Sequence, residues 1–381
     1  MSGSKEPGAA DDDPNARRTE AMRLTPLSLP ALTDAELQGP RRAGLAWQLW
    51  YDGEIRRTPV PLANGIVVLV DRPGVTVALR LDVDGRELWK IELPGLASGD
   101  PVRTQNFVAV PIGGERVVVI DVAEGRLLKH TVAVPGAPVR GGIAALGGRL
   151  WVRLGKSGDG LGPYLAVFDL MAPDDGLRLF PDPLGAAIEV RARRTNHTVV
   201  AAGEHPDGHA TLVGIDESTA RVLWEHELPR TGVVDLWAAG GLVDLVVSDG
   251  LRSWDARTGT PYTRRFGGQK LEGARLSGET LLVIVPEDDG SVRRLVAFEA
   301  ATEELRGELS GVHRIVGASS DVVLMRDPEE RTVLAELPTL LPLPLREVDA
   351  IEAASLAAFS RHAVWVVAHG GRSLSCLELP L

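Results

Sequence analysis

Six arginines stand at equivalent places in a repeating pattern along this sequence. Each precedes a strongly apolar segment, in the windows EIRRTP, PVRTQN, PVRGGI, EVRARR, GARLSG and VHRIVG. They are Arg56, Arg103, Arg140, Arg191, Arg275 and Arg314. Two further windows, VVDLWA and AASLAA, have Asp235 and Ser355 at that place. A guanidinium group offers several rigidly placed N–H donors, so a ring of arginines would bind an anionic group.

A structural role for these arginines is the alternative. Nearby acids such as Glu54, Asp100 and Glu189 could pair with them, as could backbone carbonyls at the junctions between repeats. The chain carries a net charge of −11, and ion pairs are common on protein surfaces. We therefore favour the structural role and keep anion binding as the second hypothesis.

A possible metal site lies in the stretch GEHPDGHA (203–210), which brings two imidazoles and a carboxylate close together. His205, Asp207 and His209 are residue types that bind divalent transition metals. The Pro-Asp-Gly sequence between the histidines is, however, typical of a tight turn. We predict a hairpin turn here and no metal.

Two other stretches resemble ligand-binding loops but lack essential features. RLGKSGDG (153–160) contains Gly-Lys-Ser, yet Leu150 stands where a phosphate-binding loop has its first glycine. PEDDGS (286–291) has the composition of a hairpin turn. We predict neither a nucleotide site nor a cation site in these stretches.

These candidates all belong to a repeat of short segments. In each unit an apolar, β-branched segment leads through a polar turn into a further segment that ends at an acid. The apolar segments are GIVVLVD (65–71), NFVAVPI (106–112), GRLWVRL (148–154), HTVVAAGE (197–204), GLVDLVVSD (241–249), ETLLVIVPE (279–287), SDVVLMRD (320–327) and HAVWVVAH (362–369). The acids, separated by 37 to 48 residues, are Asp82, Asp121, Asp169, Asp216, Asp255, Glu299, Glu336 and Glu378. Several short strands at this period predict the blades of a β-propeller.

The clearest repeat is GIDESTARVLWEHELP (214–229). Asp216 ends the third strand, and Trp224 follows eight residues later on the outer strand. We expect the acid to accept hydrogen bonds from backbone N–H groups of the turn and the indole to pack between blades. Asp82 and Trp89 repeat this pattern one residue shorter.

These units resemble the PQQ-like propeller repeat, A-x-D-x-x-T-G-x-x-x-W, of quinoprotein dehydrogenases and of outer-membrane assembly propellers similar to BamB. The turn WDARTGTPY keeps the motif at Asp255 but has Thr263 in place of the tryptophan. The resemblance covers roughly residues 44–381, and it is most specific at 77–93, 210–228 and 249–262. It implies an all-β propeller.

The two ends of this region complement each other. GLAWQLW (44–50) reads as a fourth strand with no preceding three, and Trp47 occupies the position of Trp224. RSLSCLELPL (372–381) ends after a third strand. We predict that the N-terminal strand completes the last blade, because closure leaves no sheet edge exposed. This arrangement gives eight four-stranded blades, or seven if the weak unit around 331–336 is an insertion.

Composition limits the remaining possibilities. Residues 1–43 are rich in Pro, Asp, Ala and Gly and are expected to form a largely disordered tail, with a capping box at 33–36 and a possible docking segment at 24–37. The acidic charge argues against nucleic-acid binding, and no apolar run is long enough for a membrane-spanning helix. With one cysteine, Cys376, and no visible secretory signal, we expect a cytoplasmic protein.

The function predicted from the sequence is a non-catalytic propeller, monomeric as a ring, that binds a protein partner through one face or the channel mouth. The alternative is a small-ligand binder or enzyme that uses the arginine-lined channel for an anionic substrate or a quinone. Quinoprotein dehydrogenases are larger and exported, and they often carry adjacent cysteines. We therefore predict no quinone cofactor.

Overall fold

The computed structural model contains a compact unit over Gly39–Leu381, and the residues whose structure is described all belong to it. They are 43–104, 106–128, 132–156, 160–172, 175–229, 232–247, 250–262, 273–286, 293–299, 302, 304–345, 351, 354–360 and 362–379. The predicted tail up to residue 42, residues 287–291 of the acidic turn, Ser157 and Thr263 lie outside them.

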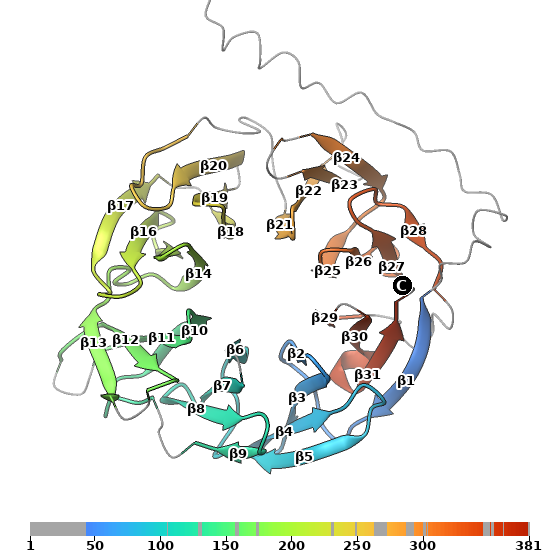
Figure 1. Cartoon of the computed structure of the whole chain (residues 1–381), viewed down its shortest axis with the longest axis horizontal. Coiled ribbons are helices and arrows are strands. Elements are labelled where there is room, and N and C mark those ends of the chain that lie inside the picture. Colours follow the sequence, from blue (N-terminus) through green and yellow to red (C-terminus); the bar gives the residue numbers. More distant parts are fainter. Residues whose placement is uncertain are drawn as a thin grey trace, which may run out of the picture. The chain divides into compact units, whose positions relative to one another are not determined.

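Eight antiparallel sheets form the blades of a β-propeller, with the first strand of each blade innermost (Figure 1). Blades 1 to 4 consist of β2 (Val60–Leu62), β3 (Gly65–Arg72), β4 (Val75–Leu81) and β5 (Glu87–Glu92); β6 (Val102–Thr104), β7 (Phe107–Ile112), β8 (Arg116–Asp121) and β9 (Arg126–Leu127); β10 (Val139–Leu146), β11 (Arg149–Leu154), β12 (Tyr164–Asp169) and β13 (Leu177–Pro181); and β14 (Glu189–Thr195), β15 (Thr198–Glu204), β16 (Ala210–Asp216) and β17 (Val222–Leu228).

Blades 5 to 8 complete the ring. They consist of β18 (Val233–Ala239), β19 (Leu242–Val247) and β20 (Gly250–Asp255); β21 (Gly273–Ser277), β22 (Thr280–Pro286), β23 (Arg293–Glu299) and β24 (Leu305–Ser310); β25 (Arg314–Ala318), β26 (Val322–Arg326), β27 (Thr332–Glu336) and β28 (Pro342–Leu343); and β29 (Leu356–Phe359), β30 (Ala363–Ala368), β31 (Ser373–Glu378) and β1 (Gly44–Trp50). A short 3-10 helix, η3 (His369–Gly371), links β30 to β31. The weak unit around 331–336 is the third strand of blade 7, so the seven-bladed alternative is wrong and the eight-bladed prediction is confirmed.

Blade 5 has three strands within the described residues. At the position of its outer strand, a single bridge joins Trp254 to Pro261. The four-stranded prediction is confirmed for the seven other blades.

The apolar cores lie between neighbouring blades. One core joins Val67 and Leu69 of blade 1 to Val108 and Val110 of blade 2. The second strand of a blade is a nearly continuous apolar run because both of its faces are covered. Each sheet is therefore stabilised by the sheets on either side.

Strand β1 closes the ring, as predicted. It pairs antiparallel with β31, and Trp47 lies opposite Cys376. Cys376 is buried, and this burial raises the pKa of its thiol to about 12. Ala43, the residue before β1, is also buried and forms a bridge to Leu345.

We expect a protein lacking residues 1–42 to melt like the full chain and one lacking residues 1–51 to melt well below it. The longer deletion removes β1 and exposes the edge of β31. Loss of one packed aromatic side chain such as Trp47 costs about 3–5 kcal/mol of unfolding free energy. Calorimetry of both truncations measures the difference, and equal melting temperatures would contradict closure by β1.

Candidate functional site

The predicted turn acids accept hydrogen bonds from the turn that follows each third strand. Asp216 Oδ1 accepts from the hydroxyls of Ser218 (2.6 Å) and Thr219 (2.8 Å) and from their backbone N–H groups (3.1 and 2.8 Å). These hydrogen bonds lower the pKa of Asp216 to about 2. Asp255 accepts from the N–H of Thr258 at 2.7 Å and from its hydroxyl at 2.8 Å, and the pKa of Asp255 is lowered as well.

The other aspartates of the repeat act in the same way. Asp82, Asp121 and Asp169 each accept, at 2.9 Å, the backbone N–H of the residue two positions ahead. Five carboxylates thus hold their turns in shape, as predicted, and are committed to structural hydrogen bonds.

The repeat tryptophans join one blade to the next. The indole N–H groups of Trp47, Trp89 and Trp224 donate to backbone carbonyls of the following blade at 2.8, 2.9 and 2.8 Å. In each case the acceptor directly follows the turn acid, and these acceptors are Val83, Val122 and Ala256. The predicted packing between blades is confirmed, but sequence reasoning missed the hydrogen bond.

Blade 3 makes the same contact with a different donor. Arg149 Nη1 donates to the carbonyl of Glu217 at 2.5 Å, and Glu217 directly follows the turn acid Asp216. An arginine on the second strand therefore replaces the tryptophan of the outer strand. The carbonyl after the acid is the common acceptor at these four junctions.

A glycine in each turn makes room for the indole of the preceding blade. Gly85, Gly125 and Gly259 have φ values of 80°, 62° and 70°, in the left-handed region that glycine adopts most readily. A Cβ atom at these positions would lie 2.9, 2.6 and 2.6 Å from the tryptophan ring. The glycine is thus required both by the turn and by the contact.

The six predicted ring arginines have different surroundings. Arg56 lies in the loop before β2 and pairs with Glu54 at 2.7 Å. Arg103 donates to the carbonyl of Pro61 in blade 1 at 2.7 Å. Arg314 donates, at 3.5 Å, to a backbone carbonyl of the connection into blade 8. These three contacts are of the kind that a structural role requires.

Strand register places the arginines at different levels. Arg103 pairs with Val108, beside the end of its hairpin, whereas Arg191 pairs with Ala202, well away from the end of its hairpin. Arg140 is exposed near the start of β10. The six positions aligned by sequence therefore do not form a ring at one height in the channel. Ligand binding by all six arginines remains a prediction that the structure does not test.

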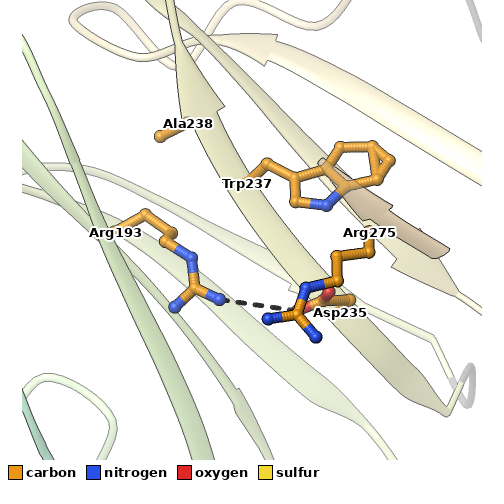
Figure 2. A pocket seen from close by; sticks show the side chains of 5 residues that line it. All are labelled: Arg193, Asp235, Trp237, Ala238 and Arg275. Atoms are coloured by element: carbon orange, nitrogen blue, oxygen red, sulfur yellow. Dashed lines mark ion pairs between the residues drawn. The ribbon is translucent and has the colours of Figure 1, made fainter. Parts of the chain in front are cut away.

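Three neighbouring inner strands, β14, β18 and β21, bring together a smaller group of residues. They line a cavity of about 410 Å³ with Arg193, Asp235, Trp237, Ala238 and Arg275. Figure 2 shows the side chains of Arg193 and Arg275 extending toward Asp235.

The sequence signal that could have identified two of these lining residues is their spacing. Arg193 follows Arg191 by two positions, and Trp237 follows Asp235 by two. Residues two apart on a strand lie on the same face of the sheet.

Positive charge exceeds negative charge at this cavity. The Asp235 carboxylate lies 3.7 Å from Arg193 and 4.0 Å from Arg191, and it accepts the N–H of Leu236 at 2.8 Å. Burial raises the pKa of Asp235, while the Leu236 hydrogen bond and the arginines, including Arg275, oppose this shift. Two guanidinium groups, those of Arg193 and Arg275, thus line the cavity together with one carboxyl group.

The predicted hairpin turn between the two histidines is confirmed. The N–H of His205 donates to the carbonyl of His209 at 2.8 Å. The two imidazoles stack at 4.0 Å, and His209 Nδ1 lies 2.5 Å from Asp207 Oδ1. Within the described residues, no group of three or more His, Cys, Asp or Glu side chains could hold a metal ion.

The remaining sequence candidates are readily placed. Gly155 and Lys156 lie between strands β11 and β12, and neither residue belongs to a helix. None of the described segments is a helix long and apolar enough to cross a membrane.

Comparisons with known proteins confirm the resemblance predicted from the sequence. Residues 40–162 match a family described as outer membrane protein assembly factor BamB. A search of curated proteins gives no match. The eight blades agree with this resemblance to PQQ-like propellers.

Solved structures resemble the chain over most of its length. The computationally designed Ika8 protein has a TM-score of 0.64 and 16% identity, covering 89% of this chain and 100% of its own. BamB from Moraxella catarrhalis has a TM-score of 0.58 and 14% identity, covering 88% and 98%. Quinohemoprotein alcohol dehydrogenase ADHIIG from Pseudomonas putida HK5 has a TM-score of 0.57 and 11% identity, covering 88% and 76%. Likeness at these identities establishes the fold alone.

We expect Gly259→Ala to destabilise the propeller more than Gly74→Ala does. Both glycines have positive φ, 70° and 81°, but only a Cβ at Gly259 would meet Trp224, because Gly74 has open space around it. The control should cost about 1–2 kcal/mol, and overpacking at Gly259 should add about 1–3 kcal/mol. Urea unfolding measures both variants. Equal losses would contradict the proposed contact.

We expect Asp216→Asn to lower the melting temperature at pH 7 but to have little effect near pH 2. The folded-state pKa of Asp216, about 2, lies below its unfolded value. The stability from its charge is therefore present above about pH 4 and is lost as the pH falls through about 2. Melting curves of both proteins from pH 7 to pH 2 measure the difference. A constant difference across this range would contradict the role of the charge, and Asp84→Asn in an exposed turn position is the control.

Proposed function

We propose that this PQQ-like propeller is a scaffold that binds another protein through the face carrying the acid turns. The supporting observation is the distribution of exposed apolar side chains. Twelve large apolar residues are exposed within the described part of the chain. Six of them lie in an acid turn or at the start of the strand region that follows it, and they define the acid-turn face: Val83, Leu88, Met171, Val222, Leu223 and Leu341.

Topology explains why these residues share a face. The strands of a blade alternate in direction, so connections alternate between its two ends, and every turn from a third to a fourth strand opens on the same side. Single exposed apolar residues are ordinary. Here they recur at similar positions in blades 1, 3, 4 and 7, with Met171 65% and Val83 56% exposed. Apolar groups within a polar surround suit a protein interface.

The comparisons support partner binding without identifying the partner. The family that matches residues 40–162 is described as an assembly factor, and BamB of Moraxella catarrhalis resembles the chain over 88% of its length. Fold likeness alone does not transfer function. Ligand binding or catalysis in the channel remains the alternative function. The cytoplasmic location is a separate expectation, which cell fractionation would test.

Co-purification with matched variants tests the proposed face. One variant carries Leu88→Gln, Leu223→Gln and Leu341→Gln on the acid-turn face. Its control carries Leu96→Gln, Leu161→Gln and Ile188→Gln, which are similarly exposed but lie in connections at the opposite ends of the strands. We expect the first variant to recover about tenfold less partner than the wild type, since a few apolar anchors dominate most interfaces. The control should recover as much as the wild type.

Quantitative mass spectrometry of the tagged protein from its native host gives the measurement. Equal loss of partner in both variants, or no stoichiometric partner with the wild type, would overturn the proposal. Melting temperatures of the two variants show whether either one is misfolded.

A further inference from the structure

The tip of the hairpin between β15 and β16 brings two imidazole rings into direct contact. The rings of His205 and His209 stack with their centroids 4.0 Å apart and their planes 10° from parallel. Two backbone hydrogen bonds close the turn between them. The N–H of His205 donates to the carbonyl of His209 at 2.8 Å, and the N–H of Gly208 donates to the carbonyl of His205 at 2.9 Å. The closed turn therefore holds each ring against the other.

The two rings have partners of different charge. His209 Nδ1 lies 2.5 Å from Asp207 Oδ1, which also accepts the backbone N–H of His209 at 3.3 Å. His205 Nε2 lies 2.9 Å from the hydroxyl of Thr211, a buried side chain that is 5% exposed. A carboxylate can balance the charge of a protonated imidazole, but a hydroxyl group carries no charge. The ring of His205 therefore has no charged hydrogen-bond partner among the described residues.

Burial and neighbouring charges act together on His205. Burial and the adjacent ring of His209 lower the pKa of His205, and Arg153 on β11 lowers it further. The carboxylates of Asp207 and of Glu227 on β17 act in the opposite direction, but the pKa of His205 remains below its usual value. The surroundings of this ring thus favour its neutral form.

Two further acids of this region are engaged elsewhere. Asp182 forms a buried ion pair with Arg153, with Oδ2 2.8 Å from Nε. Glu204, which directly precedes His205, accepts the backbone N–H of Val233 at 3.3 Å. Neither carboxylate is hydrogen-bonded to a ring of the histidine pair.

We propose that this hairpin is a proton-sensitive switch. While His205 is neutral, the two imidazoles stack and the turn is closed. Uptake of a proton by His205 places a positive charge beside the ring of His209, and the carboxylate of Asp207 is the one that hydrogen-bonds to the pair within the described residues. The rings then separate and the turn opens. Histidine suits such a switch because its charge changes near physiological pH.

The switch acts on the face opposite the acid-turn face. Turns from a second to a third strand open at the other end of the blade from turns that join a third strand to a fourth. The N–H of Ile188, in the connection from blade 3 to blade 4, donates to the carbonyl of Glu204 at 2.8 Å, so this connection is attached at the base of the hairpin tip. We expect proton uptake to alter this face of blade 4 and to leave the turn of Asp216 unchanged.

Histidine-selective NMR of the full chain from pH 8 to pH 4.5 follows each ring. We expect His205 to titrate below about pH 6.5, the ordinary value for histidine. The signals of His209 should show a change with the same midpoint, because the ring stack is lost at that step. His209 signals that do not respond at the His205 midpoint would overturn the switch, and so would a His205 midpoint at or above pH 6.5.

Variants separate the switch from ordinary titration. Asp207→Asn removes a carboxylate that favours charged His205, so the His205 midpoint should fall further. His205→Gln should abolish the shared change in the His209 signals. The control His362→Gln, in an exposed turn of blade 8, should alter neither result. A His209 change that persists in His205→Gln would contradict the proposal.

Thermal melting gives a second measurement. The folded-state pKa of His205 lies below its unfolded value of about 6.5. The stability from neutral His205 is therefore present above about pH 6.5 and is lost as the pH falls through the folded-state pKa. Between pH 7 and pH 5 the melting temperature should fall further for the wild type than for His205→Gln. An equal fall in both proteins would overturn the switch.

Hydrogen exchange tests whether the turn itself opens. Exchange of the backbone amides of residues 203–211, corrected for the intrinsic pH dependence, should become faster in the wild type as the pH falls below about 6. The amides of the Asp216 turn are the internal control and should keep their protection. Unchanged protection of residues 203–211 over this range would overturn the opening step.

Discussion

Each blade of this ring has two apolar faces and can cover them only with its neighbours, so the first and last blades must meet. Strand β1, which precedes the first blade in the sequence, satisfies this requirement because it pairs with β31 as the outer strand of the last blade. The inner strands of all blades then lie around the centre of the ring (Figure 1). The cavity between β14, β18 and β21 depends on this arrangement, because its residues come from three blades.

The contacts that join the blades explain why the repeat contains its particular residues. An acid fixes the turn, the turn presents a carbonyl, and a glycine leaves room for the indole that donates to it. Arg149 shows that the acceptor is more constant than the donor. The side chains that identify the repeat in the sequence therefore make structural contacts. Binding or catalysis would depend on residues that lie between them in the sequence.

The acids and tryptophans were predictable because they act within a short turn or across a junction that recurs at every period. The arginines were not, because their positions depend on the register of each inner strand. Bulges shift that register after Val139 in β10 and after Val233 in β18, and a bulge changes where the following side chains point. The cavity was not predicted from the sequence either, because Arg193, Trp237 and Arg275 come together only through packing between blades.

The place of Cys376 gives the ring an internal reporter. Its thiol is buried on β31, opposite Trp47 of the closing strand, and burial raises the pKa of the thiol to about 12. Its side chain packs in the core that blade 8 shares with blade 1. The thiolate is the reactive form of cysteine, so a labelling reagent modifies this residue at neutral pH when that core opens. The rate of labelling thus measures how often the first and last blades separate, without any engineered probe.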